Sequence, residues 1–130
     1  MKISLSELVS YEKKPRVVKK PLVSITKNGL ISFNEGFIDR FGIDRTMANA
    51  CKPYFHAKKQ MMIFQFINVP DKNALIISKN RDKKLIFSIK SFILSLNKRF
   101  EKMVNHYEPF SVDVDGLDAA FGIYVKKKLK

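Results

Sequence analysis

The sequence predicts an α+β fold made mostly of strands, in which two ββαββ units follow an N-terminal arm. Three observations lead to this prediction. Residues 23–43 have the pattern of a strand, a tight turn, a strand and a short helix. A similar pattern returns in the second half of the chain, and two further strand-like runs follow each copy. The expected division is an arm over 1–21 and one domain over 22–130, with repeats at 22–68 and 74–130.

The first unit opens with a hairpin centred on Asn28-Gly29. An Asn-Gly pair favours a type I′ turn, because both central residues of that turn need positive φ. Asn34 is expected to cap a helix at about residues 35–42. Gly42 then ends this helix, at a position where a left-handed residue is usual. A unit of this size cannot bury its apolar face alone, so it needs a partner.

The second copy is the predicted partner. Ile-Thr-Lys-Asn at 25–28 returns as Ile-Ser-Lys-Asn at 77–80, and Phe-Ile at 37–38 returns at 92–93. The turn between the first two strands is longer in the second copy, and it is rich in basic residues.

The second helix is predicted over 92–104 with Ser91 as its cap, and Lys98, Arg99 and Lys102 fall on its polar face. The strands expected after the two helices are Cys51–Ala57, Met61–Ile67, Phe110–Val114 and Phe121–Val125. The apolar helix faces predict a core that contains Phe37, Phe41, Phe92, Leu96 and Phe100.

The charge balance indicates a polyanionic partner. The chain has 25 Lys and Arg against 12 Asp and Glu, which gives a net charge of +13. Such a field attracts nucleic acid, although a lysine-rich codon usage explains part of the excess. The predicted phosphate contacts lie on the long second turn, on the arm and beside the first turn. They are Lys79, Arg81, Lys83 and Lys84, then Lys13, Lys14, Arg16, Lys19 and Lys20, and Lys27.

The arm combines a short helix with a basic linker. Residues 4–12 have capping-box spacing at Ser4 and Glu7, and this helix is expected to pack on the strands, with a partner-docking or dimer helix as the alternative. Residues 13–21 carry five positive charges and two prolines, so this linker is extended and either follows phosphates or stays solvated.

The remaining composition points to a cytoplasmic protein, nucleoid-associated or equivalent. The chain has one cysteine and therefore no internal disulfide, which fits a reducing compartment. No apolar run reaches the roughly 18 residues that span a membrane, and the N-terminus lacks a signal-peptide pattern.

No catalytic residue, metal ligand or cofactor is predicted. The glycines are scattered at turns and form no phosphate-binding loop. Cys51, His56 and His106 are far apart in sequence, so a shared metal site would need a coincidence of folding. Asp113 and Asp115 lack the further acidic partners of a nuclease site or a calcium loop.

A family resemblance rests on the first unit, where an Ile-Thr-Lys-x-Gly turn precedes a short strand and a helix ending Phe-Gly-Ile. The matching residues are Ile25, Thr26, Lys27, Gly29, Ile31, Phe41, Gly42 and Ile43. In this motif the chain resembles the AbrB-like swapped-hairpin DNA-binding family, and its two units look like the tandem arrangement of MraZ-like proteins. The resemblance implies one pseudo-two-fold barrel of interleaved units. The chain departs from the family at Asn34 and Leu30, where a proline and a polar residue are usual.

The resemblance implies a DNA-binding protein that regulates transcription, with duplex DNA as the favoured partner and a homo-oligomer as a further option. One alternative is a Whirly-like binder of single-stranded DNA or RNA. That architecture has four strands before each helix, whereas the helix at 35–42 comes earlier here. An exposed aromatic stripe on the hairpin over 51–67 would suit base stacking, but apolar residues on both of its faces favour burial. Another alternative is a small protein-interaction module of viral or mobile-element type.

Overall fold

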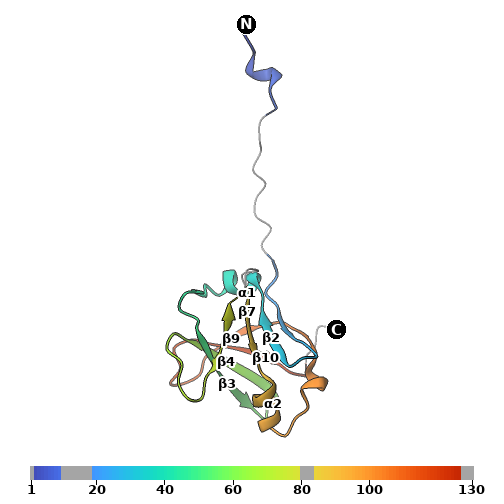
Figure 1. Ribbon diagram of the computed structural model, residues 1–130, viewed down its shortest axis with the longest axis vertical. Coiled ribbons are helices and arrows are strands. Elements are labelled where there is room, and N and C mark those ends of the chain that lie inside the picture. The colour runs from blue at the N-terminus through green and yellow to red at the C-terminus, as the bar shows by residue number, and fades with distance from the viewer. Residues whose placement is uncertain (1, 10–18, 80–83, 127–130) are drawn as a thin grey trace.

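The computed structural model describes residues 2–9, 19–79 and 84–126, and it contains two five-stranded antiparallel sheets (Figure 1). The strands of the first sheet are, in order, β6 (Ser78–Lys79), β7 (Leu85–Ser88), β2 (Leu30–Phe33), β1 (Val23–Ile25) and β8 (Asn105–Tyr107). Those of the second are β5 (Leu75–Ile76), β3 (Ala50–His56), β4 (Met61–Ile67), β10 (Ala120–Tyr124) and β9 (Phe110–Val112). The helical elements are α1 (Glu35–Arg40), α2 (Lys90–Ser95) and the 3-10 turns η1 (Leu5–Glu7) and η2 (Phe100–Met103). The predicted α+β class, mostly strand, is confirmed.

Both halves of the chain contribute to both sheets. In the first sheet β2 pairs with β7, and in the second sheet β4 pairs with β10. The sheets are also linked along the chain, because only Ile77 separates β5 from β6. The Ile77 amide donates to the Asn49 carbonyl, 3.1 Å away. The core therefore lies between sheets that neither half could complete alone.

The first hairpin turn differs from the predicted type I′. Among its residues only Gly29 has positive φ, at 80°. The Gly29 amide donates to the Thr26 carbonyl at 3.0 Å, and the Thr26 amide donates to the Leu30 carbonyl at 2.9 Å. This is a type I turn followed by a left-handed residue. The Gly29 carbonyl accepts a 2.8 Å hydrogen bond from the Ile89 amide, which ties this turn to the residue before α2.

The caps of α1 are those that the sequence predicts. The Asn34 side-chain oxygen accepts from the Phe37 amide and from the Leu22 amide, each at 2.9 Å. Gly42 follows the helix with φ of 62°. The Ile43 amide then donates to the Ile38 carbonyl at 3.0 Å, which completes a Schellman motif.

The predicted helix over 92–104 is wrong, because α2 ends at Ser95. Its N-cap position is Ile89, which makes no side-chain cap bond, so the predicted Ser91 cap is also wrong. Asn97 adopts a left-handed φ of 58°, and the Lys98 amide donates to the Ile93 carbonyl at 3.3 Å. Apolar residues continue at helical spacing beyond the end of α2, because Phe100 and Met103 of η2 also face the core. This spacing led to the longer helix prediction.

Phe33 lies at the centre of the core and is fully buried. Its ring centroid lies 4.9 Å from that of Phe37, 5.3 Å from Phe64, 5.1 Å from Phe66 and 5.9 Å from Phe87. These rings come from β2, α1, β4 and β7, so one side chain connects both sheets and both halves. The burial expected for most aromatics of the 51–67 hairpin is confirmed for Phe64, whereas Tyr54, Phe55 and Phe66 are half-buried and pack against the buried clusters.

The predicted helix-face core is only partly correct. Phe37 and Phe100 are buried, whereas Phe41, Phe92 and Leu96 are half-buried. Phe41 follows the last turn of α1 and rests against Phe37 and Phe121 with one side open. Helix α2 is short and buries only Ile93.

The described part of the arm falls into two pieces. In residues 2–9 only η1 is helical and no residue is buried, so the expected packing of this segment is wrong, and Ser4 forms no side-chain cap. Residues 10–12 lie outside the described part. Lys19 and Lys20 pass over Gly36 of α1, where a Cβ would clash with their carbonyl oxygens.

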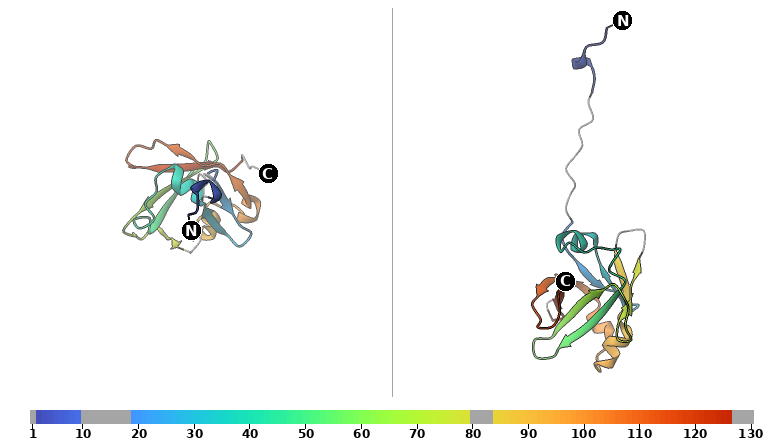
Figure 2. Two further views of the ribbon diagram at one scale, coloured as in Figure 1. Left: turned by 90° about the horizontal axis from the view of Figure 1, so that it is seen from above. Right: turned by 90° about the vertical axis from the view of Figure 1, so that its left-hand side faces the viewer.

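The two helices mark opposite ends of the body. Helix α1 lies beside the end of the arm, and α2 lies at the opposite end of the body (Figure 1 and the right view of Figure 2). No helix among the described residues is long and apolar enough to cross a membrane.

Candidate nucleic-acid interface

Several predicted phosphate contacts lie outside the described residues. These are Lys13, Lys14 and Arg16 of the arm and Arg81 and Lys83 of the long turn. Lys79 lies in β6, but its side chain is also outside the described part. These residues stay predictions.

The predicted contacts that the structure describes do not form one cluster. Lys19 and Lys20 lie beside α1, and the Lys19 ammonium is 3.8 Å from a Glu35 carboxylate oxygen. Lys27 is exposed on the first turn, which packs against the start of α2 at the other end of the body. Lys84 is half-buried where the chain enters β7.

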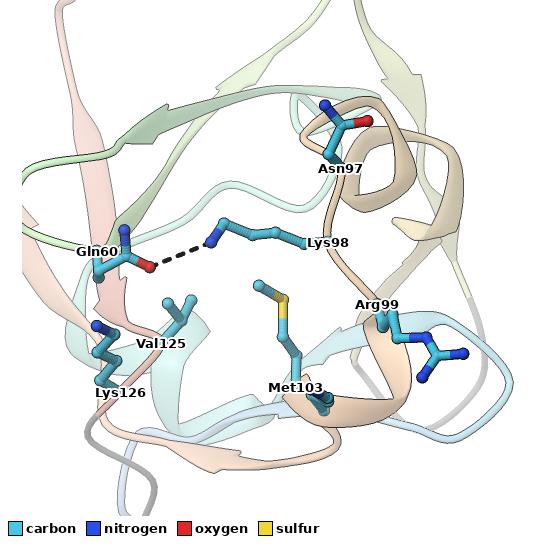
Figure 3. Close-up of a pocket in the computed structure, with 8 residues that line it drawn as sticks. Gln60, Asn97, Lys98, Arg99, Met103, Val125 and Lys126 are labelled. Atoms are coloured by element: carbon cyan, nitrogen blue, oxygen red, sulfur yellow. Dashed lines mark hydrogen bonds between the residues drawn. The ribbon is translucent and has the colours of Figure 1, made fainter.

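A basic pocket of about 630 Å³ opens at the α2 end of the body (Figure 3). Its walls come from four separate segments: the β3–β4 turn, the α2–η2 connection, η2, and the residues after β10. The lining residues are Gln60, Asn97, Lys98, Arg99, Lys102, Met103, Val125 and Lys126. We call this the basic pocket.

The lining is suited to an anion. It contains the four basic residues Lys98, Arg99, Lys102 and Lys126 and no acidic residue. Met103 and Val125 are the apolar members, and both side chains are buried. Lys98 is half-buried, whereas Arg99, Lys102 and Lys126 are exposed, so most of the attraction for an anion is screened by water and weakens as salt rises.

Two contacts fix the position of the Lys98 ammonium group in the pocket. Its ammonium nitrogen lies 3.3 Å from the Gln60 side-chain oxygen and 5.1 Å from the centroid of the Phe55 ring. An ammonium has three N–H donors, so a hydrogen bond to Gln60 leaves donors for an anionic ligand. The amide and the ring hold the charge across the pocket before any ligand binds.

The other basic residues surround this centre. In Figure 3 the Lys126 ammonium lies on the Gln60 side of the pocket, while the Arg99 guanidinium points away from Gln60. Lys98 is thus the half-buried basic residue of the pocket, and Arg99, Lys102 and Lys126 are its exposed basic residues.

Two residues of the pocket have an unusual backbone conformation. Gln60 and Asn97, with φ of 51° and 58°, are the only non-glycine residues of positive φ in the described ranges. The Gln60 side-chain amide donates to the Ala57 carbonyl at 2.6 Å, and the Gln60 carbonyl accepts from the Val125 amide at 3.0 Å. Both conformations have structural roles, since Asn97 ends α2 and Gln60 closes the β3–β4 turn, where its backbone amide donates to the Ala57 carbonyl at 3.3 Å.

The pocket was not predicted from the sequence. Lys98, Arg99 and Lys102 were expected on the polar face of one long helix, but they lie on a connection and on η2. Asn97 is the residue that could have indicated the end of α2, because asparagine, like glycine, can end a helix in the left-handed conformation.

The described residues assemble no metal site from His, Cys, Asp and Glu. His106 Nδ1 lies 2.7 Å from the Ser24 hydroxyl, and His56 Nδ1 accepts from the Lys59 amide at 3.1 Å. Cys51 is fully buried, and this burial raises the pKa of its thiol. Cys51, His56 and His106 thus do not form a shared metal site among the described residues.

No protein-family model, curated protein or solved structure matches this chain. The resemblance to the swapped-hairpin family thus rests on the residues of the first unit.

Proposed function

We propose that this protein is a non-enzymatic nucleic-acid-binding protein that holds phosphate groups in the basic pocket. One observation carries the proposal: the pocket has four basic lining residues and no acidic one. The net charge of +13 supports it, because a field of this sign draws polyanions to the surface.

The proposed architecture is a pair of interleaved repeats. Both helices have six residues, and both end in a left-handed residue followed by the same backbone hydrogen bond. Gly42 and Asn97 therefore occupy the same position after their helices, and Glu35 and Lys90 are the corresponding first helical residues. The pairings of β2 with β7 and of β4 with β10 support two interlocked ββαββ units of the swapped-hairpin kind.

Such an architecture, together with the motif of the first unit, supports duplex DNA as a partner and a role in transcription regulation. The basic loops suit phosphates of either duplex or single strands, since phosphate contacts position a nucleic acid without reading its sequence.

A protein-interaction module is the second candidate, and a specific observation favours it. In the described N-terminal segment Ile3, Leu5, Leu8 and Val9 are exposed, and Val9 is 100% exposed. Apolar side chains in this number on a short segment are typical of a partner-docking motif. This function would show itself as affinity for a protein without salt-sensitive binding of nucleic acid.

A titration against duplex DNA, single-stranded DNA and RNA at two salt concentrations tests the proposal. We expect binding to at least one of them, with affinity that falls as salt rises. Absence of binding to all three at low salt would contradict the proposal and favour the interaction module.

A further inference from the structure

The second sheet has apolar side chains on both of its faces. Successive residues of a strand point to opposite faces, and in β4 Met62 and Phe64 belong to the core between the sheets. Met61 and Ile63 belong instead to a separate, smaller cluster on the outer face. The described helices do not cover this cluster, because their buried apolar residues all lie in the core.

Three aromatic residues from three different strands lie on the outer face. Tyr54 of β3 is opposite Ile63 of β4, which is in turn opposite Gly122 of β10. Phe110 of β9 is opposite Gly122 on its other side, and directly opposite residues of antiparallel strands share a face. Tyr124 follows Gly122 by two residues and therefore lies on the same face. Tyr54, Phe110 and Tyr124 are half-buried above the buried Ile63, and we call them the aromatic face.

Two of these rings are held in place by the sheet. The centroids of Phe110 and Tyr124 are 4.7 Å apart, and their planes are 25° from parallel. Gly122 leaves room for this arrangement, since a Cβ at that position would be 3.1 Å from Phe110 Cε2 and 2.8 Å from Val112 Cγ2. Rings that are ordered before binding lose little freedom when a ligand stacks on them.

One end of the aromatic face is basic. The β3–β4 turn lies at the same end of the sheet as Tyr124, because the start of β4 pairs with the end of β10. Lys58 and Lys59 of this turn and Lys126 after β10 are exposed, and they outnumber the acidic Glu108, which precedes β9 at this end. The basic pocket opens here too, since the same turn and Lys126 line it. The acidic residues of the β9–β10 connection lie at the opposite end of the sheet.

This combination of rings and charge favours a polyanion with aromatic groups over a second copy of the chain. Each copy has a net charge of +13, and like charges oppose association. Aromatic rings beside basic residues are the means by which proteins hold single strands, because every base has a face that can stack. The bases of a duplex are already stacked and paired with one another, so the strand must be unpaired.

We propose that the aromatic face binds single-stranded nucleic acid by stacking of unpaired bases on Tyr54, Phe110 and Tyr124, with the backbone phosphates toward the basic end of the sheet. This inference rests on the proposed nucleic-acid function and narrows its substrate. Oligothymidine and oligouridine share this chemistry and differ in the sugar, so both serve as probes.

The first test compares two variants of one residue in the full-length protein. Tyr124→Leu keeps an apolar side chain but removes the ring, and Tyr124→Phe keeps the ring as the matched control. For whichever probe binds wild type more tightly, affinity should fall by about fivefold or more in the leucine variant and be retained in the phenylalanine variant. Tyr54→Leu and Tyr54→Phe repeat the comparison on another strand, in case a variant at position 124 does not fold. Equal affinities of the leucine and phenylalanine variants would overturn the inference.

The second test separates stacking from charge. The leucine variants remove no charge, so duplex affinity and the slope of log K against log salt should stay as in wild type. Equal weakening of duplex and single-strand binding would overturn the inference, and so would a wild-type dimer that Tyr124→Leu dissociates. Salt-sensitive binding that neither leucine variant changes would refute the aromatic face alone. If the wild-type protein binds no nucleic acid at all, the proposed function fails too.

Discussion

Gly29 lies directly against Lys90: a Cβ placed on Gly29 would be 2.9 Å from the Lys90 Cβ. The first residue belongs to the opening hairpin and the second to α2, so a turn of one half is fitted to a helix of the other. The hydrogen bond from the Ile89 amide to the Gly29 carbonyl, at 2.8 Å, reinforces this contact. Any side chain at position 29 must disturb it.

Gly29→Ala should therefore lower the free energy of unfolding by more than strained backbone alone explains. Gly116→Ala is the matched control, because Gly116 has a similar φ of 87° but no atom near its Cβ position. Strain at positive φ costs roughly 1–2 kcal/mol, and the clash at Gly29 adds to it. Urea unfolding of both variants measures the difference. Equal losses would show that the contact with Lys90 is unimportant.

Phe33 and Phe41 should differ strongly in their contribution to stability. Both rings lie close to Phe37, but Phe33 is fully buried while Phe41 is half-buried. Phe33→Ala should cost about 3–5 kcal/mol in unfolding free energy, and Phe41→Ala should cost less. Thermal unfolding of the two variants checks this order. A larger loss for Phe41 would mean that the core is centred elsewhere.

Deprotonation of Tyr107 should contribute to the loss of stability at alkaline pH. Its hydroxyl donates to the Met103 carbonyl at 2.5 Å, and burial raises the pKa of Tyr107 to about 12. The folded state thus keeps a proton that the unfolded state releases near pH 10, so this stabilisation is present below pH 10 and disappears as pH rises toward 12.

Tyr107→Phe isolates the contribution of this hydroxyl. At pH 7 the variant should be less stable by about 1 kcal/mol, because the hydrogen bond is lost. The difference from wild type should shrink as pH rises from 10 to 12, as measured by urea unfolding. A difference that stays constant over this range would exclude Tyr107 as the titrating group.

The long second turn remains a predicted phosphate contact. Replacement of Arg81, Lys83 and Lys84 by Ala should weaken nucleic-acid binding and flatten its salt dependence. Arg81 and Lys83 lie outside the described residues and Lys84 is half-buried beside β7, so the fold of the variant is checked separately. Circular dichroism checks the fold and a salt titration checks the binding. Unchanged affinity and slope would assign the contact to the basic pocket or the arm.

The first half of the fold was predictable because its signals are local. Asn34 caps α1 and Gly42 ends it, as expected from residue type alone. At the second helix the N-cap position is Ile89, which makes no side-chain cap, and Asn97 ends the helix in the left-handed conformation with a weaker signal than glycine. The helical spacing of apolar residues after Ser95 then predicted a continuous helix to residue 104, which the backbone does not form.

The basic pocket was not predictable because its walls meet only through tertiary packing. The Val125 amide bonds to the Gln60 carbonyl across two distant segments, and Lys98 reaches Gln60 from a third. Sequence reasoning instead selected dense runs of charge, such as the arm and the long turn. Charge density along the chain indicates attraction to a polyanion, but it does not locate a cavity.

The salt dependence of nucleic-acid binding tests the central claim most directly. Log K should fall with log salt at a slope of about −0.9 per neutralised phosphate for duplex and nearer −0.7 for single strands. The double variant Lys98→Met and Lys126→Met should reduce the magnitude of that slope by the contribution of about two phosphates. Lys2→Met with Lys72→Met removes the same charge at exposed positions outside the pocket, and it should leave the slope nearly unchanged. Equal slopes for the pocket and control variants would contradict the assignment of phosphate binding to the basic pocket.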